Sequence, residues 1–129
     1  MEKKVPQQAI DGLGHVNNVV YVDWIQEISK SHWEARTTPV QREEVFWVVL
    51  SHFIEYKAAC FLGDVLVLKT WVDTIAGVKS ERCVEIWRKA DKQLAVKART
   101  SWCLVDAKTK RPKRITTELD QIVEKDGGQ

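Results

Sequence analysis

The sequence predicts one α+β domain in which an antiparallel sheet covers a single long helix. Two observations carry this prediction: apolar residues recur at helical spacing near the N-terminus, and the rest of the chain divides into strand-like segments joined by short turns. The length of 129 residues favours one domain, which we place at residues 1–125, followed by a disordered tail at 126–129. Since no second long helix is predicted, the sheet must bury the apolar face of the helix.

The N-terminal residues are predicted to form a short strand and then a turn. The strand spans residues 5–10, and Pro6 restricts it to a sheet edge or a strand start. Residues 11–14 (DGLG) contain two glycines in four positions, which is typical of a turn. Asn17 or Asn18 can then accept hydrogen bonds from the free N–H groups of a helix start.

The helix is predicted to run from about residue 17 to residue 33. Its apolar positions are spaced so that they share one face: Tyr21, Trp24, Ile25, Ile28 and His32. Charged and amide side chains occupy the other positions. The helix cannot continue through residues 38 and 39, because the residue before a proline disfavours helical backbone.

Four strands are predicted after the helix, at residues 46–58, 65–75, 80–89 and 94–105. The last of them alternates between apolar and polar residues, which favours one buried face and one wetter face. Turns are expected at 63–64 and 90–92, a basic loop at 108–114, and a short helix at 116–124 that begins at a threonine cap. A sheet curled around one helix leaves free edges, so we expect a homodimer and leave a dimer of dimers open.

The composition argues against several classes of function. The net charge of +2 lacks the basic excess that is typical of nucleic-acid binding. The three cysteines include no C-x-x-C pair, so we expect reduced thiols, a cytoplasmic location and no metal site. The first residues lack the apolar region of a signal peptide, and no apolar run is long enough to cross a bilayer. We therefore expect neither nucleic acid nor membrane as a partner.

A carboxylate and an imidazole, Asp11 and His15, lie four residues apart just before the predicted helix. A helix start exposes unpaired N–H groups and a positive dipole end. A carbonyl group placed there would have its developing oxyanion stabilised, and Asp11 could attack it or deprotonate a water. The alternative interpretation is local: Asp11 and Asn17 are turn and cap residues, and His15 is incidental.

Residues 11–21 (DGLGHVNNVVY) resemble the signature of the 4-hydroxybenzoyl-CoA thioesterase-like branch of the hotdog superfamily. They also resemble the H-V-N-N-x-x-Y block of acyl-ACP thioesterases. Weaker likeness at residues 54–56, 62–64 and 105–112 extends the match over most of the chain in the family's order. The resemblance implies a hotdog fold, hydrolysis of an acyl-CoA or acyl-carrier-protein thioester, and no cofactor beyond the CoA of the substrate.

The resemblance also implies roles for individual residues. Asp11 matches the catalytic carboxylate, acting as base or nucleophile, and Asn18 matches the helix-start residue whose backbone N–H faces the thioester oxygen. His15 matches a position that is often histidine in acyl-specific members. Two departures from the family pattern leave Asp11 in place: Ala9 replaces the first Asp of a D-x-D pattern, and Ile-Thr at 115–116 replaces Ile-Pro.

Substrate contacts are expected from residues in and near the matched blocks. Asn17 and Tyr21 belong to the helix block, and Tyr56 is expected to reach the site from the partner subunit, since we place the site where one helix start meets the strands of a second copy.

Several cations are candidates for binding the phosphates of CoA. The basic loop at 108–114 is one candidate, and it competes with three cations at the strand predicted over 80–89: Lys79, Arg82 and Arg88. We disfavour a nucleic-acid patch at the loop, because no aromatic residues are interleaved for base stacking. A solvated loop is its simplest interpretation.

Two other functions on the same fold remain as alternatives. Hotdog hydratases carry a pattern similar to D-x-N-x-x-H, with Asp and His five residues apart. Here the spacing is four and Leu13 replaces the Asn, so the hydratase is disfavoured. A non-enzymatic acyl-CoA sensor would bind ligand without needing Asp11, and the fold alone does not distinguish it from an enzyme. Release of free thiol from a thioester separates the sensor from the enzyme.

Overall fold

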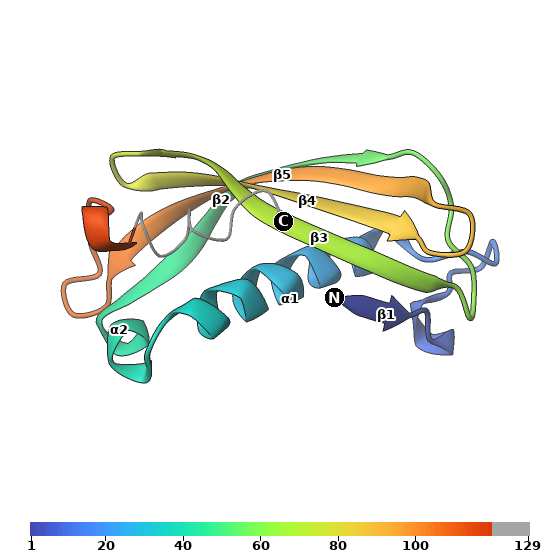
Figure 1. Cartoon of the computed structure of the whole chain (residues 1–129), viewed down its shortest axis with the longest axis horizontal. Coiled ribbons are helices and arrows are strands. Elements are labelled where there is room, and N and C mark those ends of the chain that lie inside the picture. Colours follow the sequence, from blue (N-terminus) through green and yellow to red (C-terminus); the bar gives the residue numbers. More distant parts are fainter. Residues whose placement is uncertain (120–129) are drawn as a thin grey trace.

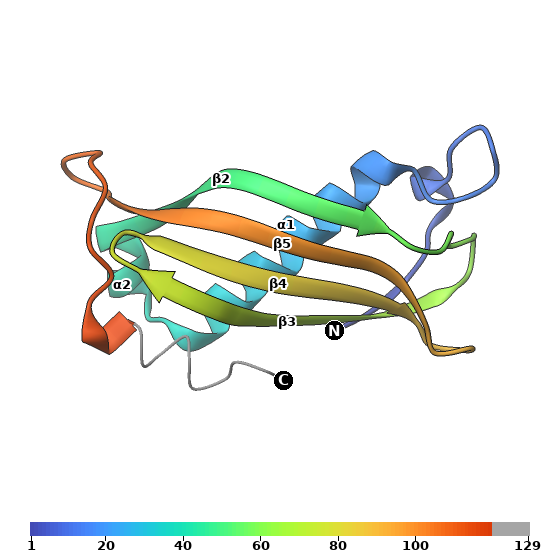
Figure 2. The ribbon, with the colours of Figure 1, turned by 90° about the horizontal axis from the view of Figure 1, so that it is seen from above.

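The computed structural model describes residues 1–119. Along the chain lie β1 (Glu2–Lys4), the 3₁₀ turn η1 (Gln7–Ala9), α1 (Asn18–Arg36), α2 (Pro39–Glu44), β2 (Val45–Tyr56), β3 (Val65–Ala76), β4 (Lys79–Arg88) and β5 (Gln93–Asp106). The strands of this part of the chain form one antiparallel sheet in the order β1-β3-β4-β5-β2, and α1 runs beneath it (Figures 1 and 2). The predicted α+β arrangement is confirmed. None of the helices described is long and apolar enough to span a bilayer.

The core lies between α1 and the concave face of the sheet. All five residues of the predicted helix face are buried, and Ile25 is fully buried. They pack against apolar residues of the three central strands, among them Leu66, Leu68, Val84, Ile86, Val96 and Ala98. Burial of this much apolar surface is the main favourable term in folding, so the register of these strands fixes where α1 lies.

The first strand differs from the prediction. Residues 5–10 do not form a strand; instead β1 (Glu2–Lys4) pairs with β3, and η1 follows. The Val5 N–H donates to the Asp64 carbonyl oxygen at 2.9 Å, but Pro6 has no N–H with which to extend the ladder. The chain therefore turns at Pro6 and leads into the loop before α1.

The second helix was not predicted. In α2 (Pro39–Glu44), Thr38 and Gln41 form a reciprocal capping box: the Gln41 N–H donates to Thr38 Oγ1 at 3.2 Å, and the Thr38 N–H donates to Gln41 Oε1 at 2.8 Å. A proline at the first helical position suits such a start. The helix turns the chain from α1 into β2 (Figure 1).

The rest of the predicted order is confirmed, and the four strand bounds shift by no more than two residues. The helix predicted at 116–124 begins within the described residues, where the Leu119 N–H donates to Thr116 Oγ1 at 3.3 Å. Its remaining residues and the tail at 126–129 lie outside the described part of the chain.

Candidate active site

The loop that holds Asp11 and His15 is closed by backbone hydrogen bonds. Ile10 and Val16 form an antiparallel bridge across its base, and the Asp11 N–H donates to the His15 carbonyl oxygen at 2.9 Å. The Val16 N–H donates to the Cys60 carbonyl oxygen at 2.9 Å, which ties this loop to the connection between β2 and β3 (Figure 1). These bonds hold the loop with Asp11 and His15 beside the N-terminus of α1.

The Asp11 carboxylate interacts directly with the His15 ring. Asp11 Oδ1 accepts from the Leu13 N–H at 2.8 Å and from the His15 N–H at 3.3 Å, and Oδ2 lies 3.2 Å from His15 Nδ1. The same Nδ1 lies 3.4 Å from the Val16 carbonyl oxygen. Because both neighbours are acceptors, Nδ1 carries the proton of the neutral ring and Nε2 is left as the acceptor. The side chains are 22% and 35% exposed, so a ligand can reach both.

The start of α1 presents an unpaired donor beside this pair. Asn17 is the N-cap, as predicted, and its Oδ1 accepts from the Val19 N–H at 3.1 Å. The Val20 N–H donates to the Asn17 carbonyl oxygen, whereas the Asn18 N–H finds no acceptor within residues 1–119. A free N–H at the positive end of a helix is a suitable oxyanion donor. The Asn17 amide oxygen is used for this cap, and a contact between Asn17 and substrate stays a prediction.

Two tyrosines lie at the same end of α1 but in different environments. The Tyr56 hydroxyl donates to the Asn18 carbonyl oxygen at 3.4 Å, so Tyr56 reaches the helix start of its own chain and needs no partner subunit to do so. Tyr21 is 2% exposed and packs against Tyr56 and Trp24. Burial raises the pKa of the Tyr21 hydroxyl and keeps it protonated. Tyr21 therefore packs beneath the site, and its contact with substrate stays a prediction.

Two of the predicted phosphate-binding cations lie away from Asp11 within one chain. Lys79 is exposed at the β3–β4 turn, at the opposite end of the sheet from the Asp11 loop (Figure 1). Arg82 is 6% exposed, and its side chain contacts His32 of α1. Burial keeps this guanidinium away from the hydrated phosphates of CoA, so the structure gives the phosphate-binding prediction for Arg82 no support.

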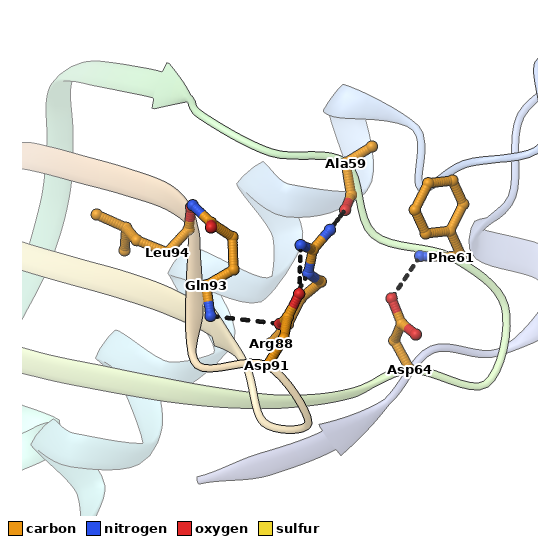
Figure 3. Close-up of polar contacts among 7 residues, drawn as sticks. All are labelled: Ala59, Phe61, Asp64, Arg88, Asp91, Gln93 and Leu94. Atoms are coloured by element: carbon orange, nitrogen blue, oxygen red, sulfur yellow. Dashed lines mark hydrogen bonds and ion pairs between the residues drawn. The ribbon is translucent and has the colours of Figure 1, made fainter.

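Arg88, the third candidate, has a structural role that the sequence did not indicate. Its guanidinium binds both oxygens of Asp91, at 3.2 and 2.6 Å, and donates to the Ala59 carbonyl oxygen at 2.8 Å (Figure 3). The Asp91 carboxylate raises the pKa of Arg88. Ala59 precedes Cys60, whose carbonyl oxygen holds the residue before the α1 cap. Arg88 therefore positions the helix start. The sequence does not predict these contacts, because they join the β4–β5 hairpin to the separate loop that contains Ala59.

A His15→Gln variant is expected to lower kcat about 10- to 100-fold with little change in thermal stability. The ring lies at the surface of the loop and holds Asp11, whereas glutamine keeps a donor but loses the imidazole. Measuring kcat and Tm on the same preparation checks this. If His15 served only to pack the loop, the variant would instead melt at a much lower temperature and keep near-normal activity per folded molecule.

Several solved structures superpose on nearly the whole chain. YbaW, a probable thioesterase from Escherichia coli, superposes with a TM-score of 0.85 at 22% identity, covering 96% of this chain and 95% of its own. Slr0204, a 1,4-dihydroxy-2-naphthoyl-CoA thioesterase from Synechocystis, gives 0.83 at 16% identity, with 95% and 93% covered. SAV2348 from Staphylococcus aureus, in complex with CoA, gives 0.84 at 13% identity, with 95% and 79% covered. The predicted hotdog fold is confirmed.

The family assignment comes from sequence. No curated protein sequence matches the chain. The family model of the acyl-ACP thioesterase N-terminal domain matches residues 1–123, which include the Asp11–His15 loop, α1 and every strand of the described sheet. The match therefore extends well beyond the short H-V-N-N block from which the resemblance was first drawn. The chain belongs to the acyl-ACP thioesterase family and matches its N-terminal domain.

Proposed function

We propose that the chain hydrolyses an acyl thioester of CoA or of an acyl carrier protein to a free acid and a thiol. The observation that carries this proposal is the Asp11 carboxylate, held by His15, at the start of a helix whose Asn18 N–H is unpaired. Membership of the acyl-ACP thioesterase family supports a thioester substrate. The CoA bound to the structurally similar SAV2348 supports a CoA-type thiol.

The chemistry follows from these groups. The thioester oxygen binds the Asn18 N–H, where the helix dipole stabilises negative charge. Asp11 either removes a proton from a water that attacks the carbonyl carbon, or attacks that carbon itself to give an anhydride that water then hydrolyses. The C–S bond breaks, the thiolate leaves and takes up the proton, and the free acid remains. His15 orients the carboxylate through Nδ1.

We further propose a homodimer formed through β2, an outer strand of the sheet (Figure 2) that stands at the opposite end of the strand order from β1. Four apolar side chains of β2 are more than a third exposed: Phe46, Val48, Leu50 and Phe53. A long apolar edge strand is stabilised by pairing with another strand. Pairing about a twofold axis through the midpoint of β2 is antiparallel, so Val45 of one chain would lie opposite Tyr56 of the partner subunit.

Such pairing would complete the site from the second copy. The Tyr56 end of β2 adjoins Asn18, whereas the Val45 end pairs with Asp106 of β5, just before the basic loop at 108–114. Lys110 of this loop lies over the Phe46 ring, 5.4 Å from its centroid. In the twofold dimer each helix start therefore faces the basic loop of the other chain, and this loop supplies cations for the CoA phosphates in place of Lys79.

The proposal is tested with short, medium, long and aromatic acyl-CoAs and a matched acyl carrier protein, with free thiol as the readout. We expect thiol release that saturates with substrate and depends on enzyme concentration. Binding of acyl-CoA without release, seen for every member of the panel, would contradict hydrolysis and favour the acyl-CoA sensor.

A further inference from the structure

A cavity of about 380 Å³ lies between the second half of α1 and the sheet. Most of its wall area is aromatic and aliphatic, from side chains that include Trp33, Trp47, Val72 and Trp102. Ser80 and the buried Arg82 belong to its polar lining, together with charged residues nearer the solvent: Lys30, Glu34 and Arg42. This volume is within the range of small-molecule sites. The chemistry proposed for Asp11 uses none of these residues, so the cavity needs its own explanation.

Arg82 is a buried cation without an anionic partner in the part of the chain described. Its Nη1 donates to Thr70 Oγ1 at 3.0 Å, and its Nη2 lies 3.0 Å from His32 Nδ1. Since a guanidinium only donates, His32 Nδ1 is the acceptor and its ring proton lies on Nε2. Both partners are uncharged, and these bonds use two of the five guanidinium N–H groups. Burial lowers the pKa of Arg82 to about 10, so it stays charged at neutral pH.

A buried charge is costly unless an opposite charge pairs with it. After burial, the nearby Arg36 guanidinium is the second cause that lowers the pKa of Arg82. An anionic group of a ligand inside the cavity would offset this cost, whereas a methyl end would leave the charge uncompensated. The apolar walls suit a short hydrocarbon spacer behind such a group. The bulk and hydration of the CoA phosphates exclude them from a site of this size.

We propose that this cavity binds the distal end of the acyl group and that this end carries a carboxylate, which pairs with Arg82. The substrate class is then a thioester of a dicarboxylic acid. This inference rests on the proposed thioesterase function. In the twofold dimer, the helix start of the partner subunit lies beside the cavity of this chain and holds the thioester, so the acyl group extends from one chain into the other.

The test compares adipoyl-CoA with hexanoyl-CoA, which have six-carbon acyl groups and differ in a distal carboxylate or methyl. We expect kcat/KM to favour adipoyl-CoA by about 10- to 100-fold, Arg82→Met to reverse this preference, and Arg82→Lys to keep part of it. Arg99→Met is the matched control, because Arg99 is an exposed cation on the neighbouring strand with its own partners, Asp73 and Glu81. It should keep the wild-type preference.

The outcomes separate this inference from the function on which it rests. Wild-type preference for hexanoyl-CoA, or an equal loss of preference in Arg99→Met, overturns the dicarboxylate and leaves hydrolysis intact. If no thioester is hydrolysed, the proposed function fails. Binding of the two free acids, adipate and hexanoate, then tests whether the cavity takes a carboxylate. Adipate should raise the Tm of the wild type and of Arg82→Lys more than hexanoate does, and should not raise that of Arg82→Met. Equal Tm shifts by the two acids would overturn the inference.

Discussion

An Asp11→Asn variant is expected to lower kcat by roughly 10²–10⁴ while the protein stays folded. Asparagine keeps an oxygen that can accept from the Leu13 and His15 N–H groups, as Asp11 Oδ1 does. The turn is therefore preserved, whereas the charge, the basicity and the Oδ2 acceptor that faces His15 Nδ1 are lost. Turnover of the best acyl-CoA in the panel, measured together with Tm, checks the prediction. Near-normal thiol release by the folded variant would show that Asp11 is only a turn residue.

Asp64 offers a matched control for this variant. Its carboxylate also closes a short turn, since Oδ2 accepts from the Phe61 N–H at 2.9 Å (Figure 3). This turn leads into β3 at the end of the molecule where the loop before α1 also lies (Figure 1). An Asp64→Asn variant should keep nearly wild-type turnover. If both variants lost activity equally, the loss would reflect disturbed loops at this end and not catalysis by Asp11.

The helix and the four main strands could be predicted because their patterns are long. The face from Tyr21 to His32 repeats over several turns, and β5 alternates through most of its length, so single exceptions do not obscure either signal. Short elements were harder. All three residues of β1 carry charged side chains and are held by backbone pairing to β3, which no side-chain pattern reveals.

The missed helix α2 did have a local signal. Thr38, Pro39 and Gln41 stand in the order of a capping box with proline at the first helical position. The same proline also explains why α1 ends before it. Because one residue can end one helix and begin the next, a stop signal needs to be examined for a following start.

The residues of the site also differ in whether their contacts are local or long-range in the sequence. Asp11, His15 and Asn17 act within seven residues of one another, so their arrangement follows from a short motif and could be predicted. The environments of Arg82 and Arg88 depend on partners far away in the sequence, His32 and Ala59 respectively. The strand pattern places both basic residues on one strand. It does not predict that Arg82 is buried or that Arg88 holds the loop at Ala59.

The proposed dimer makes a prediction that single variants do not. If each site combines Asp11 of one chain with the cavity of the other, two inactive variants can complement each other. Asp11→Asn removes the carboxylate. Lys30→Trp fills the mouth of the cavity, since Lys30 is an exposed residue of α1 that lines it, and should lower turnover by about 100-fold. Lys97→Trp, on the exposed side of β5, is the matched control and should stay active.

Mixing equal amounts of Asp11→Asn and Lys30→Trp chains, with subunit exchange, should restore about a quarter of the wild-type turnover per chain. Half of the dimers are then mixed, and each mixed dimer holds one site with an intact carboxylate and an open cavity and one site that lacks both. Light scattering should return a dimer mass or a multiple of it for each variant. Mixed chains that stay inactive would mean that Asp11 and the cavity of the same chain work together, and a monomer mass would rule out pairing through β2.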